Sequence, residues 1–183
     1  TVLVELDEGV TPTTAEGLAK LGPAEKGGIH SFGAQTFPAD GNVGFIVTNR
    51  EKAKELSADP KVEIQVVSYG FSRVNPGFMA SAPVPAAEMA LANAGLKITD
   101  MKAIKSHNPF TTNDLNFAKK FNIDVMKMNN YGSSLIYGHP QAPTAGRIIA
   151  EMLEEMVLIG GGYCLWAGCA AGDTGASMIF KVG

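Results

Sequence analysis

Cysteine is scarce in this chain and is confined to its C-terminal end. The 183 residues include two cysteines, Cys164 and Cys169, five positions apart. This pair provides neither a disulfide framework nor the ligand set of a zinc site, and unpaired thiols favour a reducing, cytoplasmic setting. Because no cysteine precedes Cys164, the long N-terminal part cannot supply a thiol nucleophile.

Charge is also sparse. Charged residues make up 18% of the chain and the formal net charge is −3, so no nucleic-acid partner is expected. The run Met156–Gly172 has no charged residue, but Gly160–Gly162 interrupt it and it is short for a bilayer. We therefore expect a buried strand after a helix here, and no membrane association. A content of 45% hydrophobic residues suits one domain with a substantial core.

Strands and helices are mixed along the whole chain, which predicts an α/β protein with a layered α/β/α arrangement. The helix at 83–94 is the best delimited, with Pro83 at its start and Gly95 just past its end. Thr13 is the expected N-cap of the first helix. The last two strands are joined by a tight turn, which predicts a hairpin. We expect strands at 1–6, 43–48, 62–69, 101–106, 163–168 and 176–182, helices at 13–21, 50–57, 83–94, 111–121 and 145–158, and a strand or Gly-rich turn at 131–138.

His139 is a candidate for proton transfer. It precedes Pro140, so its backbone is biased toward an extended loop conformation just before the helix at 145–158. The N-terminus of a helix favours a nearby thiolate or developing oxyanion. The alternative is a loop histidine with no chemical task.

Cys169 lies where a predicted strand enters the small-residue turn 170–175. Small residues let a ligand approach the backbone closely, although a buried cysteine more often acts as a small hydrophobe. The odd spacing from Cys164 places the two thiols on opposite faces of the strand. We therefore expect Cys169 to be the functional thiol and Cys164 to lie in the core.

His107 is a third candidate, because it ends a predicted strand and is followed by Asn108 and Pro109. Side chains on short loops at strand ends are frequent catalytic groups. His30 has no partner in the sequence and is expected at the surface. The Gly-rich C-terminal region contains neither a Gly-x-Gly-x-x-Gly nor a Walker motif, so no nucleotide site is expected.

Taken in order, these segments resemble the C-terminal half of a thiolase, from about Asp7 to Val182. The resemblance implies a layered α/β half with part of the CoA-binding loop region, divided into a loop-region segment at 1–41 and a thiolase C-terminal domain at 42–183. The segments that carry it are 13–21, 39–44, 51–56, Ala82-Pro83-Val84-Pro85-Ala86, His107-Asn108-Pro109-Phe110, Gly138-His139-Pro140 and Cys169-Ala170-Ala171-Gly172.

The resemblance also implies roles. His139 would activate a nucleophilic cysteine and help to form an oxyanion hole, which His107 would support. Cys169 would be the general acid/base, and the backbone N–H of Ala171 would contribute to a second oxyanion hole. CoA would be a substrate, with no cofactor and no metal. Three further residues are candidate substrate contacts: Asn108, Phe110 and Met79.

The nucleophilic cysteine of thiolases belongs to their N-terminal half, which this sequence does not include. We therefore expect the C-terminal chain of a thiolase that works with an N-terminal partner chain, in a dimer or tetramer of the assembled unit. Because Thr1 is not Met, loss of an initiator Met and a C-terminal piece of a longer protein both stay open. The alternatives are a non-catalytic CoA- or lipid-binding assembly subunit and a decarboxylating condensing enzyme; Cys169 disfavours the latter.

The sequence departs from the thiolase pattern at several positions. His107-Asn108-Pro109-Phe110 differs from the usual Asn-Glu-Ala-Phe, and Ala171 and Asp173 stand where glycine is usual. These differences concern the choice of substrate rather than the class of reaction.

Overall fold

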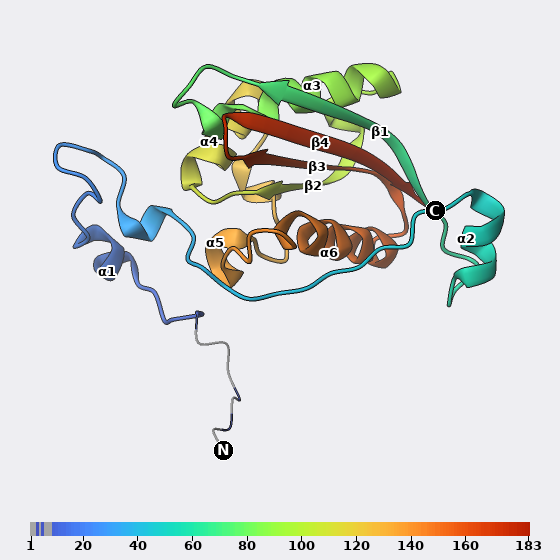
Figure 1. Cartoon of the computed structure of the whole chain (residues 1–183), viewed down its shortest axis with the longest axis horizontal. Helices are drawn as coiled ribbons and strands as arrows, with labels where there is room; N and C mark the ends of the chain where they lie inside the picture. Colours follow the sequence, from blue (N-terminus) through green and yellow to red (C-terminus); the bar gives the residue numbers. More distant parts are fainter. Residues whose placement is uncertain (1–2, 4, 6–8) are drawn as a thin grey trace.

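Four strands form one mixed sheet in the order β1-β4-β3-β2 (Figure 1). The computed structural model describes residues 3, 5 and 9–183, so most of the strand predicted at 1–6 lies outside the described residues. β2 and β3 are parallel, whereas β4 is antiparallel to both of its neighbours. The strands are β1 (Ile64–Arg73), β2 (Met101–His107), β3 (Gly162–Ala170) and β4 (Thr174–Val182).

Helices cover both faces of this sheet, which confirms the predicted layered α/β arrangement (Figure 1). On one face, α3 (Pro83–Ala94) and α4 (Thr111–Phe121) bury a cluster that includes Phe117, Leu165 and Ile179. On the other face, α6 (Thr144–Leu158) buries a second cluster with Cys164 and Trp166. In the described part of the chain, no helix is long and apolar enough to cross a membrane. The remaining helices are α1 (Ala15–Ala19), α2 (Arg50–Leu56) and α5 (Ser134–Tyr137), with 3-10 turns η1 (Phe32–Ala34), η2 (Met79–Ser81), η3 (Ile98–Asp100) and η4 (Val125–Lys127).

The bounds of α3 agree with the sequence prediction. Pro83 opens the helix and Gly95 ends it with φ 65°, a left-handed conformation that favours glycine. Gly70 on β1 lets α3 pack close to the sheet, because a Cβ atom there would lie 2.1 Å from the carbonyl oxygen of Ala86. The predicted hairpin at the C-terminus is formed by β3 and β4.

Three sequence predictions need correction. The hydroxyl of Thr14, not that of Thr13, caps α1 by accepting a hydrogen bond from Gly17 N–H at 3.0 Å. Residues 131–138 contain the short helix α5, because the hydroxyl oxygen of Ser133 caps this helix by accepting a hydrogen bond from the N–H of Leu135. Residues 43–48 form no strand, because this extended segment runs along α6, away from the sheet (Figure 1).

A buried lysine joins β2 to α6. Lys105 has no exposed surface, and its ammonium group lies 3.0 Å from Glu151 and 2.9 Å from Glu155, both on α6. Arg147 also pairs with Glu151 at 3.2 Å, and the side chain of Asn130 donates to Glu155 at 2.7 Å. An unpaired charge in such a place is strongly unfavourable, so these contacts fix α6 against β2.

Replacing Lys105 with Met should lower the free energy of unfolding by about 3–5 kcal/mol, because two carboxylates would lose their buried cation. Urea unfolding measures this change. Lys102→Met, on an exposed position of the same strand, is the matched control and should change stability by about 0.5 kcal/mol or less. Equal effects of the two substitutions would contradict a role for the ion pairs in stability.

Candidate active site

The candidate site lies at the carboxyl end of the parallel strands β2 and β3. His107 is the last residue of β2 and pairs with Gly168 of β3, so Cys169 follows at the same end of the neighbouring strand. The carboxyl ends of adjacent parallel strands are where α/β proteins commonly place reactive groups.

The side chains of His107 and His139 are in contact. Their ring centroids are 4.4 Å apart and their planes are inclined by 35°. Each ring is anchored through its Nδ1 atom, His107 by the hydroxyl of Ser134 at 3.1 Å and His139 by the hydroxyl of Thr144 at 2.7 Å. Two loops far apart in sequence therefore present their imidazoles side by side in fixed orientations.

The extended loop 36–39 holds both histidine loops in place. The N–H of His139 donates to the carbonyl of Phe37 at 2.7 Å, and the N–H of Thr36 donates to the carbonyl of Pro109 at 2.8 Å. Gly138 has φ 80°, and a Cβ atom there would lie 2.7 Å from the Cβ of Ala39. A side chain at position 138 is thus excluded both by the backbone conformation and by the available space.

Both histidines are neutral at neutral pH. Burial, with smaller contributions from His139 and the positive charge of Arg147, lowers the pKa of His107 to about 4. Burial also lowers the pKa of His139 below its ordinary value. A neutral imidazole can accept a proton, so either ring can act as a base.

The two thiols lie on opposite faces of β3, as the sequence predicted. Cys164 packs in the cluster beneath α6, where burial and the charge of Glu155 raise its pKa to about 12. Cys169 is 8% exposed, and its Sγ accepts a hydrogen bond from the side chain of Asn113 on α4 at 3.4 Å. Burial raises the pKa of Cys169, and the bond from Asn113 acts in the opposite direction.

A buried polar network lies behind the end of β2. The carboxylate of Asp114 accepts hydrogen bonds from Ser106, from Asn108 at 2.5 Å and from Asn129 at 3.2 Å. Burial raises the pKa of Asp114, and these three donors oppose the shift. Asn108 is 1% exposed and its Oδ1 atom has no hydrogen-bond partner in the structure. Its side chain therefore supports the strand end, and a contact with substrate stays a prediction.

The other candidate residues surround this strand end. Phe110 and Met79 are half-buried, and Ala171 is exposed in the turn between β3 and β4. His30, expected at the surface, is instead half-buried with its ring edge against Phe110, at a centroid distance of 5.3 Å. Among the residues that the structure describes, no group of three or more His, Cys, Asp or Glu side chains could hold a metal ion.

Sequence reasoning missed three residues that position these groups: Ser134, Thr144 and Asn113. Ser134 had a local signal, because Ser133 and Gly138 bracket an apolar turn in the manner of helix caps. Thr144 and Asn113 had no such local signal, since Thr144 contacts His139 in the preceding loop and Asn113 contacts Cys169 on β3.

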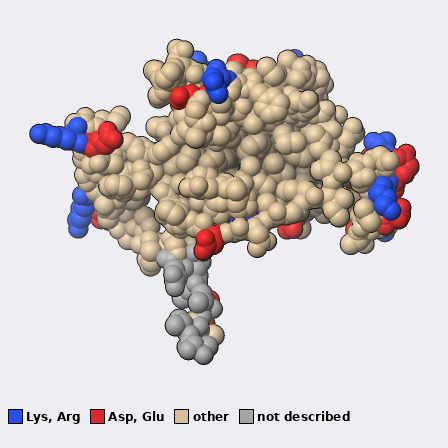
Figure 2. Space-filling model, viewed as in Figure 1, with Lys and Arg blue, Asp and Glu red and all other residues tan. Residues whose placement is uncertain are grey.

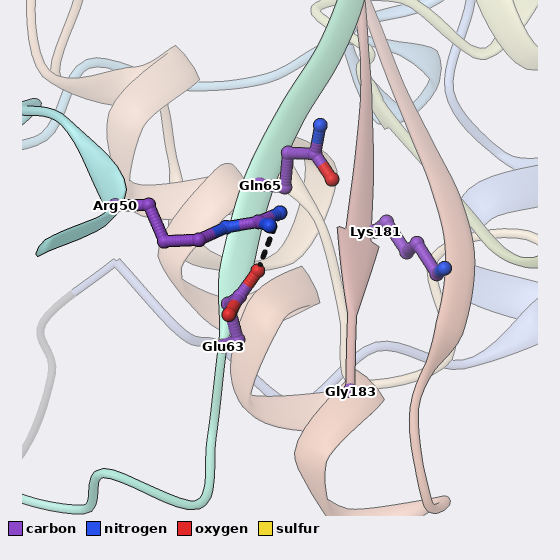
Figure 3. Close-up of a pocket in the computed structure, with 5 residues that line it drawn as sticks. All are labelled: Arg50, Glu63, Gln65, Lys181 and Gly183. Carbon is purple, nitrogen blue, oxygen red and sulfur yellow. Dashed lines mark ion pairs between the residues drawn. The ribbon is translucent and has the colours of Figure 1, made fainter. Parts of the chain in front are cut away.

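Two hollows occur elsewhere on the molecule. A groove of about 790 Å³ lies between residues 44–48 and the surface formed by β1, β4 and α6. A smaller cleft of about 280 Å³ lies near the C-terminus (Figure 3), where the Arg50 side chain extends to Glu63 at 2.8 Å. Neither is lined by a histidine or a cysteine.

Residues 60–182 match the family described as "Thiolase, C-terminal domain". The chain belongs to the thiolase family. It is 34% identical over 183 residues to the acetyl-CoA acetyltransferase of Syntrophomonas wolfei, covering 98% of this chain and 46% of that protein. It is 31% identical over 180 residues to human mitochondrial 3-ketoacyl-CoA thiolase, covering 97% of this chain and 45% of the human protein.

The fold agrees with solved thiolase structures. The crystal structure of human mitochondrial 3-ketoacyl-CoA thiolase matches with a TM-score of 0.84 and 29% identity, over 97% of this chain and 45% of that one. The crystal structure of the same human thiolase in complex with CoA matches with a TM-score of 0.83 and 28% identity, over 98% and 46%. This chain thus corresponds to the C-terminal half of a thiolase and spans slightly under half the length of these relatives.

The buried state of His107 should make this thiolase domain sensitive to acid. Its pKa is about 4 in the folded chain and about 6.5 when unfolded, so between these values the unfolded chain binds more protons. This contribution to stability is present above pH 6.5 and is lost as the pH falls toward 4.

Urea unfolding at pH 7 and pH 4.5 measures the effect. The His107→Gln variant should lose about 2–3 kcal/mol less stability over this interval than the parent chain. His30→Gln makes the same substitution away from the histidine pair and should behave like the parent. An unchanged pH dependence in His107→Gln would show that His107 is not held neutral by folding.

Proposed function

We propose that this chain is the C-terminal half of a working thiolase, which transfers acyl groups between CoA thioesters by thiolysis of a 3-oxoacyl-CoA or by the reverse condensation. The observation that carries the proposal is the contact of His107 with His139 at the end of β2, beside the end of β3, where Cys169 lies. CoA is a substrate in this proposal, and no cofactor is required.

Each candidate residue has a separate role in the proposed reaction. His139, neutral and held through Nδ1, takes the proton of a thiol supplied by the other half. The resulting thiolate attacks the 3-oxo carbonyl of the substrate in thiolysis, and the thioester carbonyl of an acyl-CoA in condensation. His107 lies against it and supports the stabilisation of the oxyanion that forms, as does the backbone N–H of Ala171 at the second reacting centre. Asn108, Phe110 and Met79 contact the substrate.

Cys169 acts as the general acid/base. In thiolysis it gives its proton to the Cα of the departing acyl group and regains one from the incoming CoA thiol. In condensation it gives its proton to the CoA thiolate that leaves when the nucleophile is acylated, and as a thiolate it then removes the Cα proton of the second acyl-CoA. A buried thiol suits both directions, because burial keeps it protonated until a substrate is present.

The nucleophilic cysteine comes from an N-terminal thiolase polypeptide. Covalent acyl transfer needs such a thiol, and this sequence has none before Cys164. In the proposed assembly, residues 1–41 belong to the CoA-binding loop region, and the unit forms a dimer or tetramer in a reducing, cytoplasmic compartment.

The outer face of α6 supports a large interface with this partner. Residues 43–48 lie along this face, where Val43 approaches Gly146, and Ile46 and Val47 are 79% and 83% exposed. On the face shown in Figure 2, charged side chains gather over α1 at one end, over α2 at the other and in a third group near the upper edge. Exposed apolar side chains such as those of Ile46 and Val47 are typical of an interface, and we place the N-terminal half there.

The chain alone should not cleave acetoacetyl-CoA or a longer 3-oxoacyl-CoA, because it has no nucleophilic thiol in the required position. Addition of a polypeptide carrying the N-terminal thiolase half should produce release of acyl-CoA. The decrease in the absorbance of the 3-oxoacyl-CoA measures this reaction. Thiolysis by the lone chain would contradict the proposal. A complex that binds CoA without turnover would instead support a non-catalytic assembly subunit.

The two cysteines should respond differently to substitution in the assembled enzyme. Cys169→Ala should nearly abolish turnover while the partner cysteine is still acylated, since the base is lost and the nucleophile is not. Cys164→Ala, the matched control on the same strand, should mainly lower stability, by about 1 kcal/mol. Single-turnover acylation and steady-state rates separate these outcomes, and equal losses of turnover would contradict the assignment.

A further inference from the structure

A side-chain amide contacts the sulfur of Cys169. Asn113 lies in the first turn of α4 and is 3% exposed. Its Nδ2 atom lies 3.4 Å from the Sγ of Cys169 and 3.4 Å from the carbonyl oxygen of Ala80 in η2. The two hydrogens of one NH₂ group are thus donated to Cys169 at the end of β3 and to Ala80 in the turn that faces it.

The orientation of this amide is determined by its other end. The Oδ1 atom of Asn113 accepts a hydrogen bond from the backbone N–H of Phe110 at 3.3 Å. Exchanging the amide oxygen and nitrogen would place two donors together at Phe110 and two acceptors together at Ala80. The NH₂ group must therefore face the sulfur, and Asn113 presents a donor to Cys169.

The other titratable side chains near Cys169 have partners elsewhere. Asp114, next on α4, is turned toward Ser106, Asn108 and Asn129. In the turn between β3 and β4, the carboxylate of Asp173 accepts a hydrogen bond from the N–H of Gly77 at 3.0 Å. His107, at the end of β2, is bound to Ser134 and stacked on His139. The amide of Asn113 is thus the side-chain donor that the structure directs at this sulfur.

We propose that Asn113 is a positioning residue for the acid/base step, which orients the sulfur of Cys169 and stabilises its thiolate form through an N–H···S⁻ hydrogen bond. This inference deepens the proposed function, because it concerns the thiol assigned there as acid/base. The bond is strongest when Cys169 has given up its proton, since hydrogen bonds to ionised groups exceed those to neutral ones. Asn113 therefore lets a buried thiol ionise during the reaction.

The test is the pH dependence of alkylation of Cys169 by iodoacetamide, followed on its own peptide by mass spectrometry so that Cys164 and any partner thiol are read separately. Only the thiolate reacts, so the midpoint of the rate profile reports ionisation of Cys169. This measurement requires neither substrate nor turnover. Its result is therefore independent of whether the chain catalyses thiolysis.

Asn113→Leu, similar in size but without a donor, should move the midpoint upward and slow alkylation about tenfold at a fixed pH below it, the effect of losing one hydrogen bond to a charged group. Asn113→Asp should move it further, because a carboxylate repels the thiolate. Asn116→Asp, the same change one turn along α4, is the matched control and should leave the midpoint in place.

A midpoint that is the same in Asn113→Leu and the parent would overturn the proposal, as would equal shifts in Asn113→Asp and Asn116→Asp. Circular dichroism establishes that each variant is folded. If Asn113→Leu does not fold, the comparison of Asn113→Asp with Asn116→Asp decides whether the proposal holds. In an active assembly, Asn113→Leu should lower kcat with little change in KM, and a change confined to KM would also contradict a role in proton transfer.

Discussion

The buried ion pairs between Lys105 and the glutamates of α6 are the contact on which the geometry of the site depends. Lys105 lies on β2 two residues before His107, and its partners Glu151 and Glu155 lie on the helix that begins just after His139. Fixing the helix against the strand therefore also fixes one histidine relative to the other. A slide of α6 that separated these groups would leave an uncompensated buried charge, which is strongly unfavourable.

Hydrogen bonds hold the other polar groups of the site in place at shorter range. Each imidazole has a hydroxyl at Nδ1, and the loop 36–39 is hydrogen-bonded to both histidine loops. Behind the strand end, the carboxylate of Asp114 receives three donors, which offset part of the cost of its removal from water. Most polar groups of the site are therefore paired, with the Oδ1 atom of Asn108 as an exception, and such preorganisation favours catalysis.

The molecule corresponds to one half of its thiolase relatives. The sheet is covered on one face by α3 and α4 and on the other by α6, so its own core is complete (Figure 1). The extended segment 43–48 lies along the far side of α6, and its Ile46 and Val47 side chains are exposed. The chain spans less than half the length of its thiolase relatives, which agrees with the proposal that the exposed side of α6 is completed by the other half.

The sequence by itself determined the elements whose signals are local. The bounds of α3 follow from Pro83 and Gly95, the C-terminal hairpin follows from its turn, and the opposite orientation of the two thiols follows from the alternation of side chains along one strand. The motifs around His107, His139 and Cys169 were also sufficient to indicate the thiolase family. Each of these signals consists of residues close together in the chain, and the family resemblance adds only the order in which the motifs occur.

Only the tertiary structure decided which residues meet. Residues 43–48 have the composition of a strand, yet they have no neighbouring strand and lie on α6 instead, because strand pairing depends on what is adjacent in space. The contact between His107 and His139 and the bond from Asn113 to Cys169 join loops and strands far apart in the sequence. The chain order contains no information on such distances, since they are determined by how α4 and α6 pack on opposite faces of the same sheet.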